Sequence, residues 1–514
     1  MFFRIGIEKG DYSWKHFLQQ EGIPYCEIDP GQNINPEEIT VYLPGNSSPL
    51  PDSSVLDYLD QGGTVIMTAR LAAEFFRLRT GKRKYTFRFS DPDSIFGSVG
   101  LVDFCSFRKM NLPGEKWEVL DDSLGISALN YGRGRILSLP FEPADELINT
   151  KVVRKKFPAD RDEYPSEKVA RISRGQIRKI IRISLEYLSH WRGIPFIQLW
   201  YYPLSARNIF IFRLDTDFCN SQEARDIYDL CRDHDIRATW FIDTGSQLRL
   251  EQDYSKFTDH EIGFHCQRHR LFHDLQKDAF YIDQGLERMQ AAGIIPRGYA
   301  APFGDWYPEL AALLAERDFC YSSEFAISYD DLPAHYPALP DSTSLLQIPV
   351  HPVSPGRLRR SHFSVKQMTE YFAARLDEKL ITGDPVIFYH HPHHQLLQVI
   401  SNLFIQAKMK NILNLTMLEL ARWWKIRNRQ NLDCKIDDVL LQITGLEPDE
   451  RFSLRISTPD GDVICKAEKQ INLSKIKFAV NMETYSLKPD VKLRRLHWRD
   501  LLYDYESLRG KLRQ

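Results

Sequence analysis

The chain has 514 residues, 43% of them hydrophobic and 26% charged, which is the composition of a folded globular protein. Its length allows about three to five domains, and its apolar content excludes a disordered, a fibrous or a disulfide-stapled chain. The 67 Lys and Arg residues nearly balance the 69 Asp and Glu residues, giving a net charge of −2, which argues against a dedicated nucleic-acid-binding protein.

Eight cysteines are spread along the chain without any Cys-x-x-Cys pair, a pattern too sparse for a disulfide framework. Glu8 and Gly10 interrupt the apolar start of the sequence, where a secretory signal peptide would continue its apolar stretch. No run approaches the ~20 apolar residues that a transmembrane helix needs. We therefore expect a cytoplasmic protein with reduced thiols and no transmembrane segment.

Residues 1–150 alternate strand patterns with helix patterns. Strands are predicted at residues 3–7, 24–28, 40–43, 64–67 and 135–140, and a helix over residues 12–21. This alternation predicts a parallel sheet covered by helices on both faces. The segment resembles a flavodoxin-like α/β domain but has no nucleophile elbow or phosphate loop, so we expect an accessory role for it.

Residues 151–205 are predicted to form a basic helical connector. Residues 151–182 contain eleven Lys and Arg against four Asp and Glu, and isoleucines and leucines recur at near-helical spacing up to Leu188. The favoured interpretation is a connector helix with a solvated charged face that ends near Gly193. The alternative is that the basic helix, residues 151–190, contacts a membrane surface or an anionic substrate.

Residues 431–514 are predicted to form a small β-rich domain. Short strand patterns at 439–443, 452–456 and 463–467 are separated by turn residues, as in a β-sandwich, and a charged tail follows. We expect a structural role, with carbohydrate binding as the less favoured alternative.

Two acidic residues indicate chemistry in the central segment, residues 206–430. An apolar strand that begins near Asn208 ends in Asp215 and Asp217, which lie two residues apart and so on the same side of an extended chain. Like charges placed together repel each other and are costly to desolvate, so we expect a cation beside them.

A pair of histidines follows downstream. His265 and His269 are four residues apart, which places both imidazoles on one face of a helical turn, and neutral imidazole is a preferred ligand of zinc. With one strand-end aspartate they would form a set of three ligands. Such a set leaves positions for water and substrate, as in a catalytic metal site.

The order of these residues resembles the polysaccharide deacetylase family, carbohydrate esterase family 4. Its first and second motifs correspond to Asp215-Thr-Asp217 and His265-Cys-Gln-Arg-His269. Its third corresponds to Ala300-Ala-Pro-Phe-Gly304, and its fifth to Val386-Ile-Phe-Tyr-His-His-Pro-His393. The resemblance covers residues 206–430 and implies a distorted (β/α) barrel of seven strands, with its active site at the carboxyl ends of the strands.

The resemblance also implies a role for each residue. Asp217, His265 and His269 would hold a divalent metal ion, zinc by default. Asp215 would be the general base, and His391 or its neighbour His390 the general acid. The residues that could contact a sugar ring, unless they lie in the barrel core, are Pro302, Phe303, Trp306 and Tyr389.

The sequence departs from the family pattern at three points. Ala300 stands where the family has an arginine that orients the catalytic acid, and Arg297 is the nearest arginine before it. Cys266 replaces a Ser or Thr, which weakens one supporting hydrogen bond. The acid of the fourth motif has two candidates, Glu324 and Asp330.

The resemblance predicts a metal-dependent deacetylase that removes an N-acetyl group from an amino sugar of a polysaccharide or glycolipid precursor. Two alternatives stay open. One is a glycan-binding or scaffold protein with a degenerate site, which Ala300 favours. The other is a hydrolase of a small non-sugar amide, as in allantoinase-like relatives that share the set of two acids and two histidines.

Overall fold

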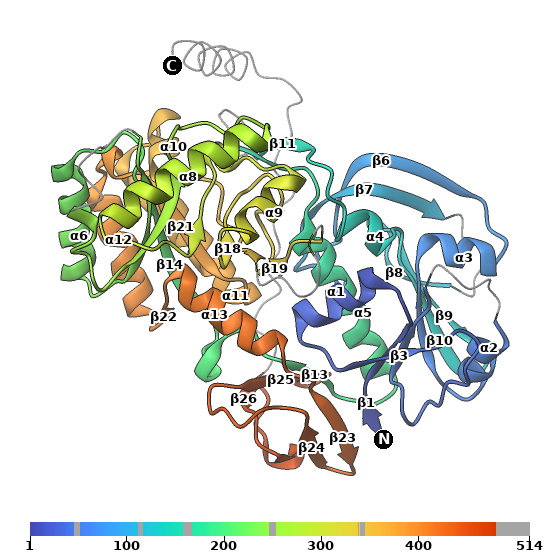
Figure 1. The fold of residues 1–514 in the computed structure, drawn as a ribbon. Coiled ribbons are helices and arrows are strands. Elements are labelled where there is room, and N and C mark those ends of the chain that lie inside the picture. The colour runs from blue at the N-terminus through green and yellow to red at the C-terminus, as the bar shows by residue number, and fades with distance from the viewer. Residues whose placement is uncertain are drawn as a thin grey trace. The chain divides into compact units, whose positions relative to one another are not determined.

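The computed structural model describes residues 1–45, 52–110, 117–157, 167–245, 253–337, 339 and 345–479 (Figure 1). Within them the chain forms two compact units. Unit 1 contains Met1–Asn149, Ile172–Arg207 and the chain from Trp423 to the last described residue; unit 2 contains Thr150–Arg171 and Asn208–Arg422. The predicted connector, residues 151–205, is therefore divided between the two units.

Unit 1 is built on a sheet of seven strands in the order β3-β2-β4-β5-β10-β9-β8. Five neighbouring strands are parallel: β3 (Tyr25–Ile28), β2 (Ile5–Glu8), β4 (Val41–Leu43), β5 (Thr64–Met67) and β10 (Gly134–Ser138). If these five strands are numbered by their order in the chain, their order across the sheet is 2-1-3-4-5, which is also the strand order of flavodoxin-like sheets. The antiparallel strands β9 (Ile126–Tyr131) and β8 (Trp117–Asp121) extend one edge.

Helices and a hairpin complete the N-terminal part of unit 1. The helices are α1 (Tyr12–Glu21), α2 (Ser53–Asp60), α3 (Ala69–Phe75) and α4 (Pro143–Glu146). The strands β6 (Thr80–Phe89) and β7 (Leu101–Met110) pair only with each other. Every residue of β2, β4, β5 and β10 is buried, which fits the continuous apolar runs of a parallel sheet covered on both faces.

The predicted basic helix is shorter than its charge pattern indicates. Helix α5 spans Arg174–Trp191, and before it β11 (Arg154–Phe157) pairs with β12 (Glu167–Ala170). Arg178 is buried against Glu21, and Arg174 is buried and donates to the carbonyl of Leu147. These basic side chains thus form an ion pair and a hydrogen bond with buried groups. A count of charges along the sequence does not show that they are buried. A contact of this helix with a surface stays a prediction.

The C-terminal strands form no sheet of their own among the described residues. β23 (Asp433–Asp437), β24 (Leu440–Thr444) and β27 (Gln470–Asn472) form a sheet with β1 (Phe2–Phe3). β25 (Ser453–Thr458) and β26 (Gly461–Lys466) form a sheet with β13 (Phe196–Leu199). These strands are therefore part of unit 1, whereas the predicted charged tail lies outside the described residues.

Unit 2 contains a sheet of nine strands, and seven neighbouring strands in it are parallel. In spatial order these are β20 (Leu346–Gln347), β18 (Tyr321–Ser322), β17 (Gly298–Tyr299), β16 (Glu261–Cys266), β15 (Ala238–Asp243), β14 (Ile209–Asp215) and β21 (Val386–His390). The short strands β19 (Ala334–His335) and β22 (Leu413–Asn414) pair with β20 and β14. His351 N donates to Ile387 O, 3.0 Å, so the chain beyond β20 meets β21 and the sheet curls.

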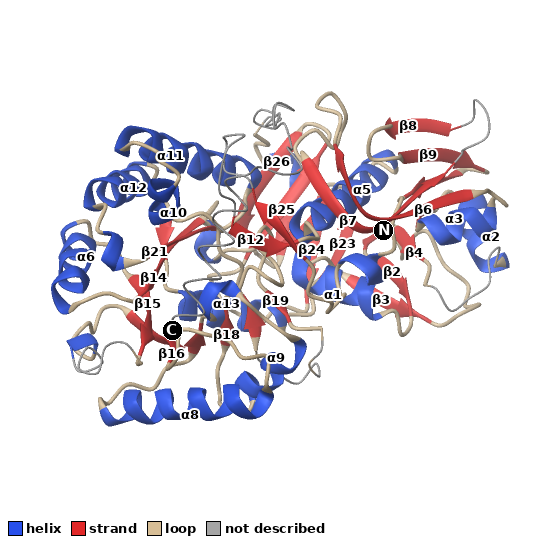
Figure 2. Ribbon diagram, turned by 90° about the horizontal axis from the view of Figure 1, so that it is seen from above, coloured by secondary structure: helices blue, strands red, loops and turns tan. Residues whose placement is uncertain are grey.

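Helices cover the outside of this sheet (Figure 2). They are α6 (Ser221–Asp233), α8 (Leu275–Ala291), α9 (Pro308–Ala315), α10 (Pro355–Arg360), α11 (Val365–Thr382), α12 (Leu397–Met409) and α13 (Met417–Asn428), whose last residues belong to unit 1. Mixed α/β architecture with a curled parallel sheet agrees with the fold class expected for residues 206–430.

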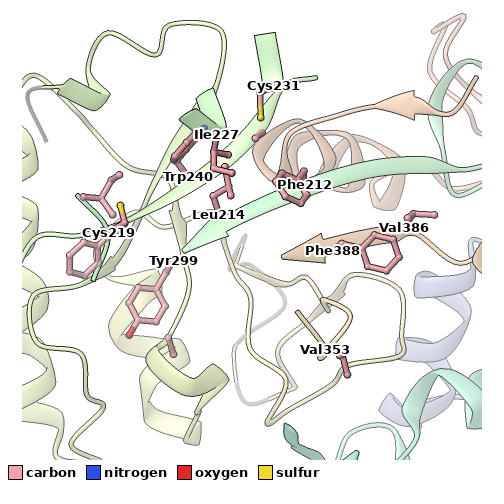
Figure 3. Packing of buried hydrophobic residues seen from close by; sticks show 14 of the residues in the cluster. Phe212, Leu214, Cys219, Ile227, Cys231, Trp240, Tyr299, Val353, Val386 and Phe388 are labelled. Atoms are coloured by element: carbon pink, nitrogen blue, oxygen red, sulfur yellow. The ribbon is translucent and has the colours of Figure 1, made fainter. Parts of the chain in front are cut away.

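The core of unit 2 sorts the side chains of β14 onto two faces. Phe210, Phe212 and Leu214 belong to one buried cluster with Ile227 of α6 and Trp240 of β15 (Figure 3). Because side chains alternate along a strand, Arg213 and Asp215 lie on the other face, toward the inside of the curl. The alternation that fills the core therefore also delivers two charged groups to the carboxyl end of the strand.

No helix among the described residues is long and apolar enough to cross a bilayer. All eight cysteines are free thiols, as expected from their spacing. A cytoplasmic location stays a prediction.

Arg427 of α13 joins separate segments of unit 1. Its guanidinium is 1% exposed and donates to the carbonyls of Leu199, Trp200 and Gln20 at 2.8–3.1 Å. It fills the space beside Gly22, whose φ of +73° ends helix α1. Burial lowers the pKa of Arg427 to about 10, so the side chain stays charged at pH 7.

Replacing this buried arginine should destabilise unit 1. We expect Arg427→Met to reduce the free energy of unfolding by about 3–5 kcal/mol, because three buried carbonyls lose their donor. Arg422→Met, at an exposed position on the same helix, should change it by less than about 0.5 kcal/mol. Urea denaturation followed by tryptophan fluorescence measures both, and equal effects of the two substitutions would contradict the assignment.

Candidate metal centre

Asp217, His265 and His269 converge at the carboxyl ends of the strands of unit 2. Asp217 follows β14, His265 lies in β16, and His269 lies in the loop after β16. His265 Nε2 is 3.7 Å from Asp217 Oδ1, and His269 Nε2 is 3.6 Å from Asp217 Oδ2. One ligand atom from each residue lies within 4.8 Å of the other two. The structure thus brings together the three residues that the sequence predicted as metal ligands.

The donor set fits a divalent cation. Asp217 Oδ1 and His265 Nε2 are buried and have no hydrogen-bond partner in the described part of the chain, an arrangement that is costly unless a cation satisfies both atoms. His265 Nδ1 donates to Ala300 O, 2.7 Å, which fixes the tautomer with the lone pair on Nε2. Ligand atoms bonded to a tetrahedral zinc ion lie roughly 3.3–3.6 Å apart, close to the separations here.

The charge states of the ligands agree with this interpretation. Burial raises the pKa of Asp217 above its ordinary value, so an uncompensated carboxylate is disfavoured here. Burial lowers the pKa of His269 to about 4, so its imidazole is neutral at pH 7, the form that binds metal ions.

Asp215 is held by a partner of its own. Arg213 donates to Asp215 through two parallel hydrogen bonds, Nε to Oδ1 at 2.7 Å and Nη2 to Oδ2 at 2.8 Å. Its Nη1 donates to the carbonyl and hydroxyl oxygens of Ser323, at 2.8 and 3.0 Å. Burial acts to raise the pKa of Asp215, but Arg213 lowers it more, so the pKa lies below its ordinary value. Asp215 is therefore a fixed carboxylate.

Arg213 is a residue of this site that the sequence analysis missed. The loss of the third-motif arginine at Ala300 directed attention to Arg297, but Arg297 is exposed and donates to Asp318 O at 3.1 Å. The available signal was an arginine inside an apolar strand, two residues before an aspartate and so on the same face.

The two candidate acids have different surroundings. His391 Nε2 lies 3.5 Å from Asp217 Oδ1, so this imidazole is part of the centre. His390 is fully buried; its Nε2 donates to Gln395 O at 3.0 Å, and its ring stacks on Phe212. Burial lowers the pKa of His391 to about 4 and that of His390 to about 3. Position therefore favours His391 over His390 for a role in chemistry.

Among the residues that the structure describes, no acid tethers His391 through Nδ1, which has no hydrogen-bond partner there. Neither fourth-motif candidate, Glu324 or Asp330, therefore holds it there. Glu324 is buried and accepts hydrogen bonds from the hydroxyls of Ser322 and Tyr336, both 2.8 Å, and burial raises its pKa to about 7. Cys266, the second-motif departure, is a buried thiol whose pKa burial raises well above its ordinary value.

The four predicted substrate contacts do not all lie in the open. Phe303 is exposed, and its ring lies 4.7 Å from that of His269. Pro302 is buried beside it, and Tyr389 is buried under His391 with its hydroxyl donated to Pro352 O. For Trp306 the structure corrects the prediction of a substrate contact. Its side chain is fully buried in the core cluster and stacked on Tyr336, so it faces no open site.

Solved structures of carbohydrate esterase family 4 match part of the chain. One is a protein provisionally described as a polysaccharide deacetylase from Mycobacterium smegmatis, with 17% identity, a TM-score of 0.36, and 44% of this chain and 93% of that chain covered. The family 4 carbohydrate esterase from Streptomyces lividans matches with 12% identity, a TM-score of 0.30, and coverages of 41% and 92%. A family 4 pseudoenzyme from Bacillus anthracis matches with 14% identity, a TM-score of 0.31, and coverages of 42% and 66%.

No protein-family model matches the sequence, and the curated proteins return no match. The structural matches confirm the predicted resemblance of part of the chain to polysaccharide deacetylases.

Removing a ligand should remove the metal. We expect the purified chain to bind about one zinc ion, and Asp217→Ala or His265→Ala to weaken the affinity by at least ~100-fold, since each deletes a ligand. His362→Ala, at an exposed histidine, should bind zinc like the wild type. Competition with a chromophoric chelator measures the affinities, and wild-type affinity in the ligand variants would exclude this centre.

Proposed function

We propose that the chain is a metal-dependent deacetylase that hydrolyses the N-acetyl group of an amino sugar in a polysaccharide or glycolipid precursor. The observation that carries the proposal is the convergence of Asp217, His265 and His269, with two unpaired buried ligand atoms, beside a second carboxylate fixed by Arg213. Binding and hydrolysis need different groups, and this arrangement supplies both.

Asp217, His265 and His269 would hold the divalent ion, with zinc as the first choice for one carboxylate and two imidazoles. When bound, such an ion would polarise the amide carbonyl and lower the pKa of a bound water towards ~7–9.

Asp215 is the proposed general base. Its pKa lies below the ordinary value, so it is ionised at pH 7, and Arg213 fixes its orientation. A carboxylate accepts up to about four hydrogen bonds, so the two bonds from Arg213 leave lone pairs for the proton of an attacking water. The water oxygen then bonds to the carbonyl carbon.

His391 is the proposed general acid. It protonates the amide nitrogen as the carbon–nitrogen bond breaks, because an unprotonated amine anion is a very poor leaving group. Its pKa of about 4 would leave it neutral at pH 7, but the negative charge that develops on the attacked carbonyl oxygen favours the imidazolium form, whose proton comes from solvent. The products are acetate and the free amine.

The degenerate-site alternative rests on Ala300, which stands where the family has an arginine that orients the catalytic acid. Against it, Arg213, two residues before Asp215 on β14, donates to both oxygens of the proposed base. Zinc-loaded protein that binds acetylated glycans and releases no acetate would restore that alternative. Screening cyclic ureides beside acetylated glucosamine oligomers distinguishes the small-amide alternative. For unit 1 we propose an accessory role.

Substitution of the proposed base or acid should stop turnover without removing the metal. We expect Asp215→Asn and His391→Ala to lower kcat by about 10²–10⁴-fold, because each removes a proton-transfer step. Acetate release from N-acetylglucosamine oligomers measures kcat, a chelator should abolish it, and zinc or cobalt should restore it. Asp233→Asn, at an exposed position on α6, is the control. Normal turnover by either variant would refute its assigned role.

The role of Arg213 is tested against that of Arg297. We expect Arg213→Lys to lower kcat roughly 10²-fold with zinc content unchanged, because lysine cannot form the two parallel hydrogen bonds that orient Asp215. Arg297→Lys should retain full activity. The opposite result, with activity dependent on Arg297 alone, would show that Asp215 is oriented from the third motif.

A further inference from the structure

Two phenylalanine rings lie against the imidazole of the metal-centre residue His269. Phe218 directly follows Asp217, and its ring centroid is 5.2 Å from that of His269 at an angle of 65°. Phe303 lies in the short turn Pro302–Gly304, and its ring is 4.7 Å from the same imidazole at 64°. The ring of Phe218 is also 6.1 Å from that of His393. Two loops from different strands thus present an aromatic ring to one imidazole.

Both rings are open to solvent. Phe218 is 52% exposed and Phe303 is 44% exposed, although large apolar side chains are normally buried. Apolar surface left in water beside a polar centre is typical of a ligand-binding site, in which a few polar groups stand among apolar walls. Core packing therefore does not explain why about half of each ring is exposed to solvent.

The backbone at both residues is held in a disfavoured conformation. Phe218 and Phe303 each have a φ of +59°, in the left-handed region that bulky residues rarely adopt. Each is the third residue of a β-turn: Cys219 N donates to Thr216 O at 3.2 Å, and Gly304 N donates to Ala301 O at 3.0 Å.

Glycine is the ordinary residue at such a turn position with positive φ. Strain of this kind clusters at ligand sites, where the surrounding structure holds it in place. The same disfavoured backbone conformation therefore occurs in both loops whose phenylalanine rings contact His269.

We infer that Phe218 and Phe303 form an aromatic pair that binds the pyranose ring of the substrate beside the metal centre. The inference rests on the proposed function and specifies its substrate class. The C–H groups of a pyranose ring offer an apolar face that packs against aromatic rings, whereas the N-acetyl group would reach Asp215 and His391. A small polar ureide would leave both rings in water, so the pair selects a sugar.

The test compares Phe218→Ala and Phe303→Ala with Phe280→Ala, a phenylalanine on α8 that is 56% exposed. The probe is the zinc-loaded protein with the N-acetylglucosamine pentamer. We expect each of the first two variants to raise KM at least tenfold, with kcat within threefold and zinc content unchanged. Phe280→Ala should behave like the wild type. An unchanged KM in both variants would overturn the inference.

Glycine variants separate binding from structure. Because both positions have positive φ, Phe218→Gly and Phe303→Gly should raise the melting temperature while they raise KM. Residues whose purpose is structural would give the reverse, a lower melting temperature with KM unchanged, and that result also overturns the inference.

Titration calorimetry distinguishes failure of the reaction from failure of the aromatic pair. If the wild type releases no acetate from the pentamer, yet binds it at least tenfold more tightly than the alanine variants do, the proposed reaction fails and the aromatic pair stands. Equal affinity in wild type and variants, or no binding by the wild type, overturns the aromatic pair.

Discussion

The pairing of Arg213 with Asp215 is the interaction on which the centre depends. Two buried carboxylates at the end of one strand repel each other and lose their hydration, so both can be ionised only if each has a counter-charge. Arg213 provides one from within β14, and it holds the pKa of Asp215 below the ordinary value. Among the described residues Asp217 has no arginine or lysine partner of this kind, and burial raises its pKa. One carboxylate is thereby fixed as an anion, and the other lacks a permanent counter-charge.

The sequence predicted what local pattern controls. Apolar runs predicted the parallel strands of unit 1 and the strand that ends at Asp215, and the resemblance to the deacetylase motifs predicted Asp217, His265 and His269 as ligands, which the fold brings together. The sequence did not predict contacts between residues that lie far apart along the chain. Glu21 forms a buried ion pair with Arg178 of α5, which lies far along the chain. Likewise, β1 and β13 pair with the C-terminal strands β23 and β25. Ala300 suggested the loss of an orienting arginine, and sequence order alone did not indicate that Arg213 donates to both oxygens of Asp215.

Aromatic residues illustrate the same limit at the site. Trp306 and Phe303 lie three residues apart in one motif, yet one is stacked in the core and the other is exposed at the metal centre. Residue type and spacing do not predict which of the two side chains is buried, because burial depends on the direction that a tight turn gives to each side chain. Phe218 drew no attention in the sequence, since a phenylalanine after a buried strand normally extends the core.

The interleaving of the two units has a consequence for synthesis on the ribosome. The main stretch of unit 2, Asn208–Arg422, is contiguous, whereas β1 and β13 of unit 1 pair with β23 and β25, which follow that stretch in the chain. Until those strands emerge, the nascent chain exposes two unsatisfied strand edges, which are templates for aggregation. A chain that stops before residue 433 would contain the whole nine-stranded sheet of unit 2, but its first unit would lack the partners of β1 and β13.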